Sequence, residues 1–81
     1  MKIQVLGPGC KRCDQLYDNV LLALRELDLS DKAELAQVKD IDVFAKYGVF
    51  VTPALVINDD VVSVGKLLSV SEIEDALKAR V

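Results

Sequence analysis

The first third of the chain changes from the apolar period of a strand to that of a helix. In residues 2–6 the apolar Ile3 and Val5 alternate with polar residues, which is the pattern of a half-buried strand. From Asp14 to Leu27 the apolar residues recur with the period of an amphipathic helix. The face that this helix is expected to bury carries Cys13, Leu16, Tyr17, Val20, Leu24 and Leu27.

The remaining chain predicts further strands and shorter helices. The strands are expected over residues 33–38, 54–57 and 61–64, and the helices over residues 41–47 and 70–79. Asp40 is the predicted N-cap of the first of these helices, and Gly48 is expected to end it. Ser69 and Glu72 have the spacing of a capping box at the start of the last helix.

The element order is β-α-β-α-β-β-α, which predicts an α/β fold in a single domain over residues 1–81. The first two strands are joined through a helix, so they should be parallel with a right-handed crossover. Residues 58–60 form a tight turn that joins the last two strands into an antiparallel hairpin. We therefore expect a mixed four-stranded sheet flanked by three helices, with helices on both faces.

Composition narrows the class of protein. Apolar residues make up 52% of the chain, which is enough for a core without disulfide staples. The formal net charge of −3 and the scattered lysines and arginines argue against binding to nucleic acid or to an anionic membrane. No apolar run approaches the ~20 residues of a membrane span, and residues 1–6 do not resemble a signal peptide. A cytoplasmic protein is therefore expected.

Both cysteines of the chain lie in residues 7–13, which read Gly-Pro-Gly-Cys-Lys-Arg-Cys. Cys10 falls at or just before a predicted helix N-terminus, where unpaired N–H groups and the helix dipole favour a thiolate. The cations Lys11 and Arg12 favour the same charged form. Cys13 lies on the face expected to be buried, where desolvation disfavours its anion and should raise its pKa. The two thiols are therefore expected to differ in reactivity.

The glycines at the start of this motif, Gly7 and Gly9, permit a tight turn and the close approach of another backbone. A purely structural disulfide between Cys10 and Cys13 would close a very small loop and constrain the unfolded chain little. The chain has no histidine that could act as a base or a metal ligand. These features favour a dithiol–disulfide redox site.

On these residues the chain resembles the thioredoxin–glutaredoxin superfamily, and more closely the small archaeal and bacterial redox-active disulfide proteins. The similarity extends over the whole chain. Its strongest features are the first strand leading into G-x-G-C-x-x-C, the Thr52-Pro53 pair before the hairpin, and Gly65 after the last strand. The resemblance implies a thioredoxin-like fold.

The resemblance also implies roles for individual residues. Cys10 would be the nucleophile and Cys13 the resolving thiol, Pro53 would be cis and face the disulfide, and the backbone of Thr52 would pair with an extended substrate. The residues expected to face the substrate are Gly9, Lys11, Arg12, Thr52, Pro53 and Gly65. The activity would be thiol–disulfide exchange with protein disulfides by a monomer, with a reductase as second partner and no cofactor or metal.

Two departures from the family pattern concern specificity. The motif is Cys-Lys-Arg-Cys rather than the Cys-Gly-Pro-Cys of thioredoxins, and Gly65 is followed by Lys66 in place of the Gly-Gly pair that helps glutaredoxins hold glutathione. Two alternatives remain open. The C-x-x-C pair could hold a soft metal or an iron–sulfur cluster, shared between two chains if four ligands are needed. The domain could also be a non-catalytic interaction module that retains the two cysteines.

Overall fold

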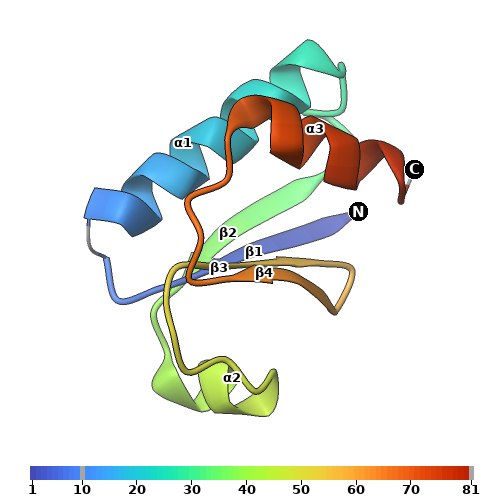
Figure 1. Ribbon diagram of the computed structural model, residues 1–81. Coiled ribbons are helices and arrows are strands. Elements are labelled where there is room, and N and C mark those ends of the chain that lie inside the picture. The colour runs from blue at the N-terminus through green and yellow to red at the C-terminus, as the bar shows by residue number, and fades with distance from the viewer. Residues whose placement is uncertain (10, 81) are drawn as a thin grey trace.

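The computed structural model describes residues 1–9 and 11–80, so that Cys10 and Val81 lie outside the described residues (Figure 1). The elements follow the predicted order β-α-β-α-β-β-α. They are β1 (Lys2–Leu6), α1 (Lys11–Glu26), β2 (Glu34–Val38), α2 (Ile41–Lys46), β3 (Ala54–Ile57), β4 (Asp60–Val64) and α3 (Val70–Lys78).

The four strands form one mixed sheet in the order β2-β1-β3-β4. β1 runs parallel to β2 and antiparallel to β3, with Ile3 opposite Leu35 on one side and Ile57 on the other. β3 and β4 form the antiparallel hairpin. The predicted α/β class and the mixed four-stranded sheet are thus confirmed.

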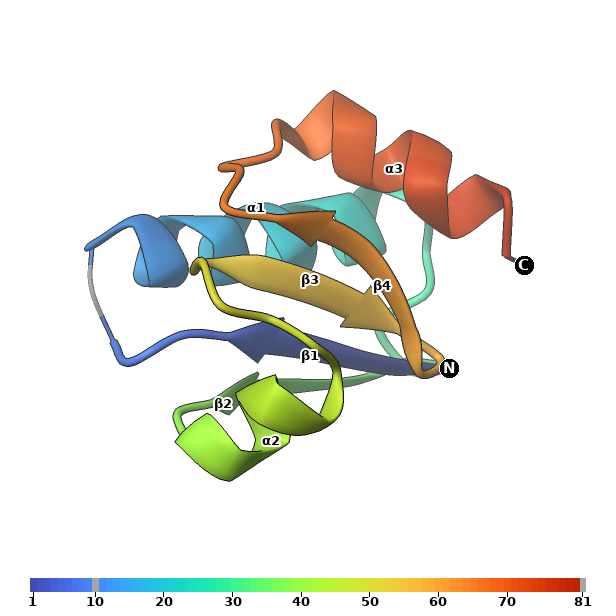
Figure 2. The same ribbon diagram turned by 60° about the horizontal axis from the view of Figure 1, so that its bottom comes forward.

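The sheet separates two layers of helix (Figures 1 and 2). α1 and α3 pack together on one face and α2 covers part of the other. Successive side chains of a strand point to opposite faces, so apolar strand residues meet helices on both sides. The larger core, on the α1 and α3 side, contains Ile3, Val5, Leu16, Val20, Ala23, Leu24, Leu55, Ile57, Leu68, Ile73 and Leu77. The smaller core, beneath α2, contains Leu6, Phe44, Val49, Ala54 and Val56.

Both predicted helix caps are present. The Asp40 carboxylate accepts the Asp42 N–H at 2.9 Å. The Ser69 hydroxyl accepts the Glu72 N–H at 3.2 Å, while the Glu72 carboxylate accepts the Ser69 N–H at 3.1 Å. Within residues 1–9 and 11–80, no helix combines the length and the apolar character needed to cross a membrane.

Some predicted boundaries need correction. The first helix begins at Lys11 rather than Asp14, so the second half of the cysteine motif is helical. The last strand begins at Asp60, which was expected to lie in the turn. Asn58 and Asp59 both have positive φ, 50° and 68°, so these two residues make the turn and Asp60 can already pair with Ile57.

Candidate functional site

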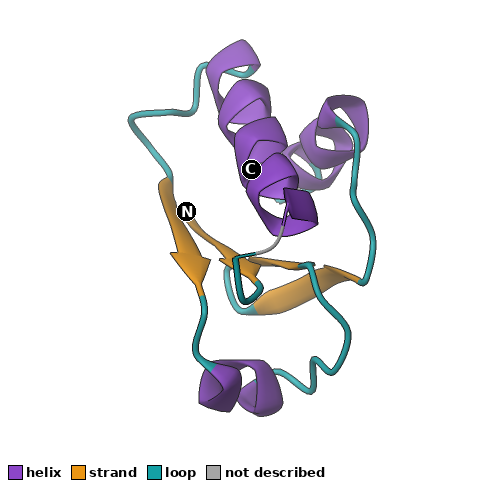
Figure 3. Cartoon of the chain, turned by 90° about the vertical axis from the view of Figure 1, so that its left-hand side faces the viewer, coloured by secondary structure: helices purple, strands orange, loops and turns teal. Residues whose placement is uncertain are grey.

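The site lies where β1 leaves the sheet and α1 begins, at the end of the molecule that faces the viewer in Figure 3. Gly7 continues the pairing of β1, since its N–H donates to the Val38 carbonyl at 2.9 Å. Gly9 has φ of +97°, a left-handed conformation that glycine adopts without steric cost. Cys10, the predicted nucleophile, lies outside the described residues, and Lys11 is exposed on the first turn of α1.

Cys13 is fully buried at the start of α1, on the face predicted from the helical period. Its sulfur lies directly against the backbone of Gly7. A Cβ placed on Gly7 would overlap the Cys13 Sγ, would approach the Cys13 Cβ to 3.0 Å, and would lie 3.9 Å from the Thr52 Cβ. Gly7, Cys13 and Thr52 therefore meet at one point, although they come from three separate segments of the chain.

The Thr52–Pro53 pair enters the site from the start of β3. The peptide bond between the two residues is cis. Pro53 is buried, whereas Thr52 is half-buried and so retains contact with solvent beside the Cys13 and Gly7 contact. The structure thus places Thr52 beside Gly7 of the motif, while the position of Pro53 relative to the Cys10 sulfur involves an atom outside the described residues.

Gly65 connects the same region to the motif helix. Its N–H donates to the Pro53 carbonyl at 2.8 Å, and its own carbonyl accepts Arg12 Nη2 at 3.1 Å. Gly65 has φ of +72°, and a Cβ there would come within 2.7 Å of the Val51 Cγ1. The structure therefore brings together Arg12, Gly65 and Pro53, which were all expected to face the substrate.

Two contributions to the site are missing from the sequence-based prediction. The first is the sulfur contact that Gly7 makes possible. The second is Lys39, whose Cε and Nζ would each lie 3.4 Å from a Cβ placed on Gly9. One signal could have found Lys39: β1 and β2 are parallel, so the residues that follow both strands emerge at the same edge of the sheet.

An apolar surface adjoins Thr52. Phe50 is 87% exposed and Ile41 is 75% exposed, which is unusual for side chains of this size. They border a hollow of about 200 Å³ between α2 and the loop before β3, lined by Ile41, Phe44, Ala45, Val49, Phe50 and Thr52. In the sequence-based prediction, residues 49–51 fall between the helix over residues 41–47 and the strand over residues 54–57 and have no assigned role.

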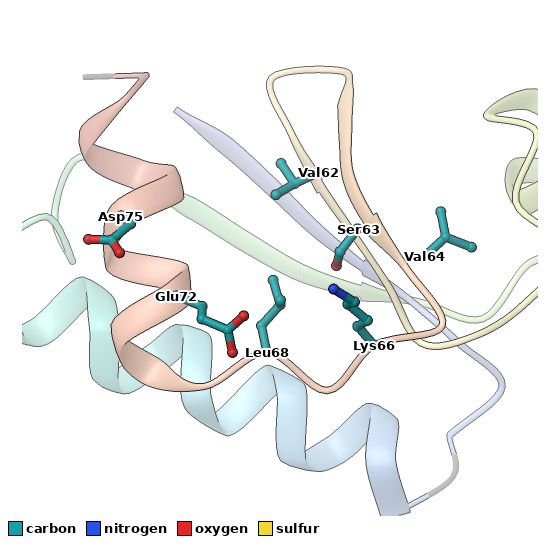
Figure 4. Close-up of a pocket in the computed structure, with 7 residues that line it drawn as sticks. All are labelled: Val62, Ser63, Val64, Lys66, Leu68, Glu72 and Asp75. Atoms are coloured by element: carbon teal, nitrogen blue, oxygen red, sulfur yellow. The ribbon is translucent and has the colours of Figure 1, made fainter.

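A larger hollow of about 480 Å³ lies elsewhere, between β4 and α3 (Figure 4). It is lined by Val62, Ser63, Val64, Lys66, Leu68, Glu72 and Asp75, a set without either cysteine or Thr52. Hydrogen bonds from Ser69 lower the pKa of Glu72, and the charge of Lys66 acts in the same direction. The Glu72 carboxylate is thus tied to helix capping rather than to the cysteine motif.

Comparisons with known proteins agree with this geometry. A family model described as "Thioredoxin domain" matches residues 1–78. A protein named thioredoxin from Methanocaldococcus jannaschii is 42% identical over 77 residues, which cover 95% of this chain and 86% of that protein. A protein named thioredoxin from Methanothermobacter thermautotrophicus is 32% identical over 77 residues, which cover 95% of this chain and 97% of that protein. The family match extends from β1 to the end of α3.

Proposed function

The chain belongs to the thioredoxin family, and from that premise we propose that Cys10 and Cys13 exchange a disulfide with disulfides of protein substrates. A thioredoxin-like redox function follows from the family. The identity of the reacting thiols and of the substrate class is our proposal. It rests on the pairing of a C-x-x-C motif with a buried second cysteine whose sulfur lies against Gly7, which the strand-entry residue Thr52 also adjoins.

In the proposed reaction, the Cys10 thiolate attacks one sulfur of a substrate disulfide. A mixed disulfide forms, and the other substrate sulfur leaves as a thiolate that takes up a proton. Cys13 then loses its proton and attacks the Cys10 sulfur. The Cys10–Cys13 disulfide forms, and the second substrate sulfur leaves and is protonated. The substrate gains two electrons from the protein and two protons, one released by Cys13 and one taken from solvent, to which Cys10 lost its proton on forming the thiolate.

The observation that carries the proposal is the position of Cys13. Its sulfur is buried against Gly7 at the start of α1, so a bulky disulfide in solvent has little access to it. A thiol in this position is suited to attack inside a mixed disulfide rather than to begin the reaction. The nucleophilic role in the first step is therefore assigned to Cys10, the other cysteine of the motif.

Thr52 supplies the proposed contact with the substrate backbone. It is half-buried beside Cys13 and Gly7 at the entrance to β3. Because Pro53 has no N–H, the strand ladder cannot extend through it, which leaves Thr52 suited to pair with an incoming extended segment. The hydrogen bond from Arg12 to the Gly65 carbonyl links the end of β4 to α1.

The remaining parts of the proposal concern the cellular setting. A reductase must return the Cys10–Cys13 disulfide to the dithiol after each cycle, because the reaction oxidises the protein. No cofactor enters the exchange itself. We propose that the chain acts in the cytoplasm as a single domain and a monomer.

A trapping experiment tests the proposal. With Ser at position 13, the mixed disulfide on Cys10 cannot be resolved, so the Cys13→Ser variant purified from cells should carry disulfide-linked proteins that reductant releases. The Cys10→Ser variant is the matched control and should carry few, because Cys13 is buried. Equal trapping by both variants, or trapping by Cys10→Ser alone, would contradict the assignment of roles.

A further inference from the structure

Lys39 lies beside the cysteine motif although neither the motif nor the family resemblance assigns it a role. Val38 directly precedes Lys39, and its carbonyl accepts the Gly7 N–H. This hydrogen bond holds the end of β2 against residues 7–9, the loop that begins the cysteine motif. The Lys39 side chain then extends along this loop, and its Cε and Nζ would each lie 3.4 Å from a Cβ placed on Gly9. The Lys39 ammonium therefore lies beside the residue that directly precedes the proposed nucleophile in the sequence.

Two further cations belong to the same edge. Lys11 is exposed on the first turn of α1, and Arg12 reaches across the site to the Gly65 carbonyl. The chain as a whole has a net charge of −3, so this group of three cations is more positive than the protein on average. Exposed cations at a helix N-terminus oppose the helix dipole, so Lys11 and Arg12 do not serve the stability of α1.

The carboxylates of the same segments are engaged by other groups. Asp14 accepts a hydrogen bond from Gln37 at 3.2 Å. Asp40 caps α2 through the Asp42 N–H, and the positive end of that helix offsets the charges of both residues. The end of the Lys39 side chain lies beside Gly9. The Lys39 ammonium therefore lies where a substrate bound beside Gly9 would meet it.

We propose that Lys39, with Lys11 and Arg12, selects substrates whose disulfide is flanked by acidic residues. This inference rests on the proposed function and adds the substrate class to it. Lys39 acts as a specificity residue: it attracts the carboxylates of the approaching segment and takes no part in the electron transfer. Charge placed around a reacting site raises the association rate of oppositely charged partners and lowers that of like-charged ones.

Single-turnover kinetics test the proposal. The reduced protein, separated from reductant, is mixed with three cyclic peptide disulfides that differ only in Glu, Gln or Lys residues flanking the cysteines. At low salt the Glu-flanked peptide should be reduced roughly tenfold faster than the Lys-flanked peptide. About 0.5 M salt should bring the two rates close together, because it screens exposed charges.

The variants assign the effect to one side chain. Lys39→Met should lower the Glu-to-Gln rate ratio about threefold, the effect of one charge at roughly 7 Å in water. Lys39→Arg should retain the ratio. Lys46→Met is the matched control, since Lys46 is also exposed but lies in the last turn of α2. It removes the same charge and should leave the ratio unchanged.

The outcomes separate this inference from the function on which it rests. If all three peptides are reduced at equal rates, or if Lys39→Met and Lys46→Met lower the ratio equally, the role given to Lys39 is wrong and disulfide exchange stands. If none of the three peptides is reduced, the proposed function fails and the inference fails with it.

Discussion

Gly7 is required at its position because of packing rather than because of backbone conformation. Its Cα faces the Cys13 sulfur so closely that a methyl group in place of its hydrogen would overlap that sulfur. Gly9 and Gly65 differ in this respect, since both have positive φ and so use the conformational freedom of glycine. The Cys13 sulfur thus occupies the space that a side chain at position 7 would otherwise fill.

Gly7→Ala should destabilise the protein by about 1–3 kcal/mol, the usual cost of forcing an extra methyl group into a packed core. It should also slow resolution of a mixed disulfide, because the Cys13 sulfur must move away from position 7. Chemical denaturation of the reduced protein measures the first effect, and single-turnover kinetics measure the second.

Two comparisons show whether the sulfur contact is the cause. A Cβ at Gly48 would meet no atom within 4 Å, so Gly48→Ala suffers only the strain of its φ of +72°, about 1 kcal/mol. It should leave resolution unchanged. In a Cys13→Ala background, the cost of Gly7→Ala should fall, because the overlapping sulfur is gone. An undiminished cost in that background would contradict this explanation.

At the scale of elements, the contact between α1 and α3 contains a pair of like charges. Glu26 ends α1 and Glu74 lies in the middle of α3. A hydrogen bond with the Glu26 carboxyl raises the pKa of Glu74, with smaller contributions from desolvation and from the charge of Glu26. A proton on this carboxyl pair therefore relieves the repulsion between Glu26 and Glu74.

The sign of this shift predicts a stabilising substitution. The raised pKa of Glu74 means that the folded state holds its proton more tightly than the unfolded state, so stability is lost as pH rises through the folded pKa. Glu74→Gln keeps a hydrogen-bond donor and removes the charge. It should therefore raise the melting temperature at pH 7 and have little effect near pH 4.

Asp75→Gln is the control for this prediction, because it removes one negative charge from the neighbouring position of the same helix. If both variants raise the melting temperature equally at pH 7, the gain comes from the net charge of the protein. If Glu74→Gln lowers the melting temperature at pH 7, the carboxyl pair is not the source of the raised pKa.

At the scale of the whole molecule, the dithiol is expected to bind zinc weakly. A closed zinc site takes four Cys or His ligands, while this chain has two cysteines and no histidine. Protein purified without oxygen should therefore contain well below one zinc or iron per chain by elemental analysis. One ion per chain would contradict the redox proposal, and one ion per two chains would favour a site shared between two copies.

Local pattern predicts much of this fold because the local signals agree with one another. The strand at residues 54–57 is predicted to the residue, since Pro53 and Asn58 bracket an unbroken apolar run. The capping box of α3 is likewise predicted from Ser69 and Glu72. α1 starts earlier than predicted because the two cations before Cys13 are poor signals for a helix N-terminus.

Other features of the site depend on contacts between distant segments. The burial of Cys13 follows from the helical period, but its contact with Gly7 depends on how α1 leaves the loop. The position of Lys39 beside Gly9 depends on the parallel pairing of β1 with β2. The irregular pairing at Leu55 and Val56, which leaves Val62 without an opposite residue, has no signal in the strand pattern.

The strand order has a consequence for how the chain is made. β1 is synthesised first, yet it lies inside the sheet and needs β3, with Ile3 opposite Ile57. While the chain grows on the ribosome, β1, α1 and β2 can assemble early, but one edge of β1 has no partner until residues 54–57 emerge. Open strand edges invite pairing with other chains. We therefore expect nascent chains stalled before residue 54 to aggregate or to be held by chaperones.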